Sequence, residues 1–289
     1  MKITQLGAPA CRGGEQPLWD EREQALYYVD NFGQKVHRWD PAKQEARSWD
    51  TPSVVTSLAL RERGGAVVTM FSGIHFLDFE GGGFEPVHPL PSPPPHVYND
   101  AKADSRGRWL IGGCTAQMHD PAPDGGLYRL DPDHRLTKLD SGIHFSNSPC
   151  FSPDEKTFYF SDSHIGHCFA YDYDIATGEV ANRRLFVDTT DLDGVPDGST
   201  VDGDGLVWIA IYGGAKIAVF TPTGKLERLV DMPVRLVSSV SFGGPDLDRL
   251  YVTTIAEGIG GEPAEPGAGC VYVIEGLGAR GIGERRYGG

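Results

Sequence analysis

One stretch sets the pattern of the whole chain: Pro196-Asp-Gly-Ser-Thr-Val-Asp-Gly-Asp-Gly-Leu-Val-Trp-Ile209. A polar residue begins a short segment, a turn rich in Gly and Asp follows, and an apolar run begins directly after the turn. Two short β-forming segments joined by Gly and Asp are typical of a β-hairpin. The stretch therefore predicts two antiparallel strands that meet at residues 202–205.

The same pattern recurs along the 289 residues. The apolar runs that follow the turns lie at 25–29, 66–69, 108–111, 157–160, 206–209 and 249–252. Each is followed by another short run, at 36–39, 74–77, 127–130, 168–171, 217–220 and 271–274. A repeat of roughly 40–50 residues with several strands per unit is typical of a β-propeller. We therefore predict an all-β, six-bladed β-propeller.

The predicted propeller is a single domain over residues 1–289, with the blades at about 13–275. Residues 276–289, which carry three Arg among glycines, are expected to form a short surface tail. In many propellers a terminal strand closes the ring. We expect residues 15–19 to do so in this chain, beside residues 271–274.

Composition limits the class of protein. With 39% hydrophobic residues the chain can bury a core, and its net charge of −14 argues against a nucleic-acid partner. The five cysteines are scattered and form no Cys-x-x-Cys pair, which fits neither a disulfide framework nor a structural zinc site. We see no signal peptide and no run of about 18 apolar residues, so we expect a cytoplasmic protein without a membrane partner.

One oxygen-bearing side chain recurs at the same place in every repeat. It lies four positions before the pair of residues that precedes each turn, and the six residues are Glu15, Thr56, Asn99, Asn147, Asp197 and Ser238. Because the first strand of each blade lines the central channel, these positions would form a ring around one axis. Carboxylate, amide and hydroxyl oxygens suit a hard divalent cation. The alternative is a water-filled channel that is polar without binding a metal.

Four sets of motifs occur in order along the chain. They are Gly14-Glu15 with Pro17-Leu-Trp19, Asn99-Asp100 with Gly107-Arg-Trp109, Ser146-Asn147 with Pro149-Cys-Phe-Ser-Pro-Asp154, and Pro196-Asp197-Gly198 with Asp202-Gly-Asp-Gly-Leu-Val-Trp208. Taken together, they resemble the SMP-30/gluconolactonase/regucalcin-like family over about residues 13–275. The resemblance implies a six-bladed propeller that binds one divalent metal at the mouth of the channel and hydrolyses sugar lactones.

The resemblance also implies roles for individual residues. Glu15, Asn147 and Asp197 look like the metal ligands, and Asn99 looks like a residue that contacts the substrate or a water beside the metal. Asp197 is the expected catalytic residue, which orients or deprotonates the attacking water. Calcium, magnesium, manganese, zinc and iron all remain candidates for the metal.

The chain departs from the family pattern beside Asn99. Typical sugar lactonases of the family have an Arg two positions earlier, where this chain has Val97. Losing a guanidinium removes several hydrogen-bond donors, so a less polar substrate is an alternative. Val97, Tyr98 and Asn99 are expected to bind the substrate, together with His119 in the long loop 113–126.

The sequence thus favours a metal-dependent hydrolase that opens a small lactone, first of all a sugar-acid lactone, as a monomer or small homo-oligomer. A second hypothesis keeps the fold and the metal but changes the substrate to a non-sugar lactone, an aryl ester or an organophosphate. A third is a non-catalytic propeller that binds calcium or a protein partner.

Overall fold

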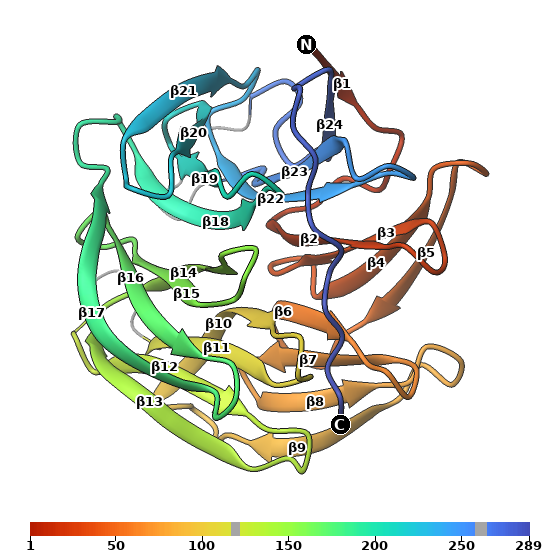
Figure 1. Cartoon of the computed structure of the whole chain (residues 1–289). Coiled ribbons are helices and arrows are strands. Elements are labelled where there is room, and N and C mark those ends of the chain that lie inside the picture. Colours follow the sequence, from red (N-terminus) through yellow and green to blue (C-terminus); the bar gives the residue numbers. More distant parts are fainter. Residues whose placement is uncertain (117–121, 258–264) are drawn as a thin grey trace.

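The computed structural model describes residues 1–116, 122–257 and 265–289. These residues form six four-stranded antiparallel sheets arranged around a central axis (Figure 1). The six-bladed β-propeller predicted from the repeats is thereby confirmed. Within the described residues, no helix has the length and apolar character needed to cross a membrane.

Blades one to five are each built from four consecutive strands, which follow one another from the axis outward. Blade one comprises β2 (Gly14–Asp20), β3 (Ala25–Asp30), β4 (Lys35–Asp40) and β5 (Glu45–Asp50). Blade two comprises β6 (Val55–Leu60), β7 (Ala66–Met70), β8 (Gly73–Leu77) and β9 (Phe84–Pro89). Blade three comprises β10 (His96–Ala103), β11 (Trp109–Thr115), β12 (Gly125–Leu130) and β13 (Leu136–Ile143).

Blades four and five follow the same order. Blade four comprises β14 (Ser146–Phe151), β15 (Thr157–Asp162), β16 (His167–Asp174) and β17 (Glu179–Asp188). Blade five comprises β18 (Val195–Val201), β19 (Val207–Tyr212), β20 (Lys216–Phe220) and β21 (Leu226–Asp231).

Blade six joins the two ends of the chain. It comprises β22 (Val237–Gly243), β23 (Arg249–Thr254), β24 (Tyr272–Glu275) and, as its outermost strand, β1 (Lys2–Gln5). β1 pairs with β24 in antiparallel register, with Lys2 opposite Glu275. The expectation that residues 15–19 close the ring beside 271–274 is therefore wrong, because residues 15–19 belong to the inner strand of blade one and the closing strand is β1.

The hydrophobic core lies between the blades. Strand side chains alternate between the two faces of a sheet, so each blade packs apolar residues against both of its neighbours. Six buried clusters result, one for each pair of adjacent blades. Trp19 stacks on Tyr251 between blades one and six, with ring centroids 5.4 Å apart. This packing fixes the inner strands relative to one another.

Every inner strand has an irregularity at its ring position. The antiparallel register shifts between Glu15 and Leu18 in β2, between Asn147 and Cys150 in β14, and at the corresponding place in the other four inner strands. A β-bulge leaves residues unpaired and turns a side chain away from its regular direction. The repeated bulge therefore presents one polar side chain per blade to the channel.

The C-terminal segment crosses the channel at the end where the inner strands finish (Figure 1). We call this end the lower mouth, and the end where the inner strands begin the upper mouth. Tyr287 is fully buried, its N–H donates to Leu60 O at 2.8 Å, and Gly288 N–H donates to Gly107 O at 2.9 Å. Residues 276–289 therefore do not form the surface tail that the sequence predicts. Their backbone hydrogen bonds connect several blades at the lower mouth.

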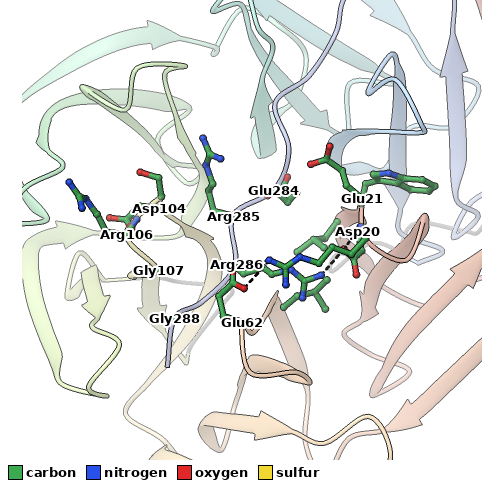
Figure 2. Close-up of a pocket in the computed structure, with 15 residues that line it drawn as sticks. Asp20, Glu21, Glu62, Asp104, Arg106, Gly107, Glu284, Arg285, Arg286 and Gly288 are labelled. Carbon is green, nitrogen blue, oxygen red and sulfur yellow. Dashed lines mark hydrogen bonds and ion pairs between the residues drawn. The ribbon is translucent and has the colours of Figure 1, made fainter.

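A second cavity, of about 570 Å³, lies at the lower mouth (Figure 2). Four of the charged side chains that line it form two ion pairs with each other. Arg286 contacts Asp20 at 2.6 Å and Arg22 contacts Glu62 at 2.9 Å, as the dashed lines in Figure 2 mark.

Candidate active site

A cavity of about 280 Å³ opens at the upper mouth, where the inner strands begin. Six of the residues singled out in the sequence line it: Glu15, Thr56, Val97, Asn99, Asn147 and Asp197. They come from blades one to five, so the ring spacing brings them together across more than 180 residues of sequence.

Two other residues that were expected to bind the substrate are not among the described residues that line the cavity. Tyr98 does not line the cavity; it is 3% exposed and packs edge-on against Tyr128, with ring centroids 5.5 Å apart. Neighbouring strand residues point to opposite faces, so Tyr98 faces the core where Val97 and Asn99 face the channel. His119 lies outside the described residues.

Hydrogen bonds fix the orientation of both ring amides. Asn99 Nδ2 donates to Ser146 O at 2.8 Å and to Asn147 Oδ1 at 3.0 Å, which uses both of its N–H groups. Asn147 Nδ2 donates to Ser163 Oγ at 2.9 Å, and this hydroxyl donates to Pro196 O at 2.5 Å. Asn147 Oδ1 is therefore held within the ring, and Asn99 Oδ1 stays available to accept a hydrogen bond.

The ring carboxylates have no cationic partner. Among the described residues, neither Glu15 nor Asp197 forms an ion pair. Burial raises the pKa of Glu15, and the charges of Asp197 and Asp100 raise it further. Burial and the charge of Asp100 likewise raise the pKa of Asp197. Like charges held together out of water require a counter-charge.

Asp100 is a third carboxylate, which the sequence pattern did not assign to the site. It is 4% exposed, accepts a hydrogen bond from Ser148 N–H at 3.3 Å, and burial raises its pKa to about 7. In a regular strand, Asp100 would point to the face opposite to that of Asn99, away from the channel. The register of β10 shifts between Tyr98 and Ala101, however, and both Asn99 and Asp100 fall in the irregular segment.

The residue after Asp197 is Gly198, and a side chain would not fit there. A Cβ at Gly198 would lie 2.0 Å from Ser239 Oγ on the neighbouring inner strand. Glycine therefore lets β18 approach β22 closely, and this approach helps to set the direction of the Asp197 carboxylate.

The donor set fits a divalent cation. Glu15 and Asp197 offer carboxylate oxygens and Asn147 offers an amide oxygen, all lining the same cavity. Oxygen donors of this kind suit hard ions such as calcium, magnesium or manganese. A bound cation would also supply the positive charge that buried Asp100 and Asp197 and half-buried Glu15 lack.

A second cluster of potential ligands lies beside the first. One donor atom from each of Cys11, Asp30 and His37 lies within 4.8 Å of the others, and all three residues are buried. Sulfur and imidazole donors suit zinc better than calcium. The Asp30 carboxylate, however, already accepts hydrogen bonds from the backbone N–H groups of Arg12, Gly13 and Gly33. Its evident role is to fix the segment that leads to Glu15.

Comparisons with known proteins agree with this architecture. The chain is 34% identical to regucalcin of Danio rerio over 279 residues, which covers 96% of this chain and 95% of that protein. It is 35% identical to regucalcin of Xenopus laevis over 296 residues, with 100% and 99% coverage.

Solved structures share the fold. A luciferin-regenerating enzyme superposes with a TM-score of 0.92 at 27% identity, covering 99% of both chains. A calcium-binding regucalcin from Agrobacterium tumefaciens gives 0.89 at 23% identity, covering 98% of this chain and 96% of that one. A gluconolactonase from Xanthomonas campestris gives 0.77 at 22% identity, with coverage of 94% and 89%. Residues 13–256 match the sequence pattern of the SMP-30/Gluconolactonase/LRE-like region, and the chain belongs to this family.

Proposed function

We propose that this protein is a divalent-metal-dependent lactonase that opens the ester bond of a small lactone at the upper mouth. One observation carries the proposal: two carboxylates without a cationic partner, buried Asp197 and half-buried Glu15, and an oriented amide oxygen line one cavity, with a third carboxylate next to them. The gluconolactonase and regucalcin relatives support a lactonase-type activity.

Glu15, Asn147 and Asp197 would hold the ion. When bound, a divalent ion supplies a Lewis acid that polarises a carbonyl group and offsets the negative charge developing on its oxygen. The protein supplies position: the hydrogen bonds from Asn99 and to Ser163 keep Asn147 Oδ1 directed into the ring.

Asp197 is the proposed general base. A carboxylate held in a buried, negatively charged setting has a higher affinity for a proton than one in water, which favours proton transfer from a water molecule. In hydrolysis the water oxygen bonds to the carbonyl carbon and the ring carbon–oxygen bond breaks. The proton taken by Asp197 passes to the departing ring oxygen. Asn99 Oδ1 can accept a hydrogen bond from the water or the substrate.

The test is proton release from a panel of lactones, with the spontaneous rate of each subtracted. Protein stripped of metal by a chelator should be inactive, and activity should return when one divalent ion is added back. Sugar-acid lactones, which the family resemblance implies, belong in the panel beside alkyl and aryl lactones. Turnover that is the same in stripped and metal-loaded protein would contradict the metal requirement.

A further inference from the structure

The wall of the upper cavity is apolar above the ring. The residue two positions before each ring residue lies at the start of its inner strand or just before it, one step nearer the mouth. These residues are Gly13, Val54, Val97, Phe145, Val195 and Leu236. None of them is polar, and four of them, Val54, Val97, Phe145 and Val195, line the cavity.

A second row of apolar side chains comes from the ends of the middle strands. Phe32 follows β3, Phe71 follows β7 and Ile255 follows β23, and all three line the same cavity. We call the two rows together the apolar collar. Seven of its residues line the cavity that contains Glu15, Asn147 and Asp197, so a substrate bound at the ring lies beside them.

Polar side chains line the cavity both at the ring and at the ends of middle strands, where Asn31, Ser163 and Tyr212 lie. No Lys or Arg is among the described residues that line it, and the acidic lining residues are the ring carboxylates Glu15 and Asp197. His164, on the turn after β15, is an exposed imidazole at the rim and stacks on His144 with ring centroids 5.1 Å apart. The collar itself offers no side-chain hydrogen bond.

We propose that the apolar collar is a binding subsite for an alkyl or aryl substituent, and that the substrate is a lactone carrying such a group instead of several hydroxyls. The assignment of the lactone group to the ring rests on the proposed function. The collar indicates which chemical groups the rest of the substrate carries. A hydroxyl buried against the collar would lose its hydrogen bonds to water without replacement, whereas each buried methylene gains about fourfold in affinity.

Binding can be measured without hydrolysis. Non-hydrolysable lactams replace the lactones: a series of δ-lactams with increasing alkyl length, and a polyhydroxylated δ-lactam of similar size. Isothermal titration calorimetry on metal-free and metal-loaded protein should show tighter binding of the alkyl series, by about fourfold per methylene until the cavity is filled. The polyhydroxylated lactam should bind at least about tenfold more weakly than the best alkyl lactam.

Variants of the collar test its position. Phe71→Asn and Val54→Asn change half-buried side chains, so the fold should survive, and each should weaken alkyl-lactam binding by about tenfold. Leu229→Asn is the matched control, since Leu229 is 43% exposed on the outer strand β21, away from the cavity. The control should bind every lactam as the unchanged protein does. Thermal melting of each variant verifies folding.

The outcomes separate this inference from the proposed function. Tighter binding and faster hydrolysis of alkyl or aryl lactones would support both. Hydrolysis of sugar lactones, with the polyhydroxylated lactam bound as tightly as the alkyl series, would overturn the collar assignment and leave the lactonase intact. Collar-dependent binding of alkyl lactams without hydrolysis of any lactone under any metal would support the subsite and overturn the lactonase.

Discussion

The two mouths of the channel differ in whether their acidic side chains have cationic partners. At the lower mouth, acids are paired with cations: Asp104 contacts Arg108 at 2.6 Å, and Glu284 contacts Lys102 at 2.6 Å. At the upper mouth, Glu15 and Asp197 have no such partner among the described residues. The lower cavity is the larger, at about 570 Å³ against about 280 Å³. Uncompensated charge, and not size, therefore distinguishes the candidate active site.

The largest expected effect is on turnover. Asp197→Asn removes the proposed base, and kcat should fall by about 10²–10⁴-fold. Steady-state proton release on the best lactone measures it. The same change removes an uncompensated buried charge, so the metal-free variant should melt at a higher temperature than the metal-free parent. Near-normal turnover with a full complement of metal would exclude Asp197 as the base.

Metal binding should depend on the oxygen ring and not on the neighbouring sulfur-containing cluster. Glu15→Gln should abolish tight binding of a divalent ion, whereas Cys11→Ser should leave one ion bound per chain. Metal analysis after gel filtration measures the stoichiometry. Ion at about 100 times its Kd should stabilise the parent by about 2.7 kcal/mol and the Glu15 variant far less. Loss of the ion in Cys11→Ser alone would instead assign it to Cys11, Asp30 and His37.

The matching substitution at the lower mouth should have the opposite effect on stability. Asp104 is fully buried and also accepts a hydrogen bond from Tyr173 Oη at 2.6 Å. Asp104→Asn leaves Arg108 without its counter-charge and should lower the free energy of unfolding by about 3 kcal/mol. Chemical denaturation of metal-free protein measures the loss. Since the lower mouth takes no part in the proposed reaction, kcat of the folded variant should stay close to that of the parent. If the metal-free Asp104 variant were as stable as the parent, the ion pairs of the lower mouth would not stabilise the fold, and the proposed difference between the two mouths would be contradicted.

The smallest expected effect is a pH dependence of the metal-free protein. Burial raises the pKa of Asp100 to about 7 from its ordinary 3.8, so the folded protein keeps a proton that the unfolded chain releases. The contribution of Asp100 to stability should therefore fall as pH rises from about 4 to about 7 and then level off. Bound metal should abolish this decline. Denaturation curves of the parent and of Asp100→Asn across the range isolate this contribution; a rise in the difference between parent and variant over the same window would contradict the assignment.

Much of the fold could be predicted from the sequence because each blade repeats the same local signals. Gly- and Asp-rich turns mark the hairpins, and a similar position before each turn places Glu15, Asn147 and Asp197 on one ring. Strand alternation alone would also have placed Tyr98 in the core. Asp100 could not be predicted this way, because a bulge suspends alternation at that point. The path of residues 276–289 could not be predicted either, because they carry no periodic pattern and pack on blades that come from distant parts of the sequence.

The pairing of β1 with β24 has a consequence for how the chain reaches this structure. Lys2 and Glu275 are partners, so β1 can pair only after β24, about 270 residues later in the chain, has been made. Contacts between such distant residues form slowly because a long loop must close first. Until then blade six presents an unpaired strand edge, to which another chain can add. Prompt pairing of β1 with β24 therefore protects this edge from association with another chain.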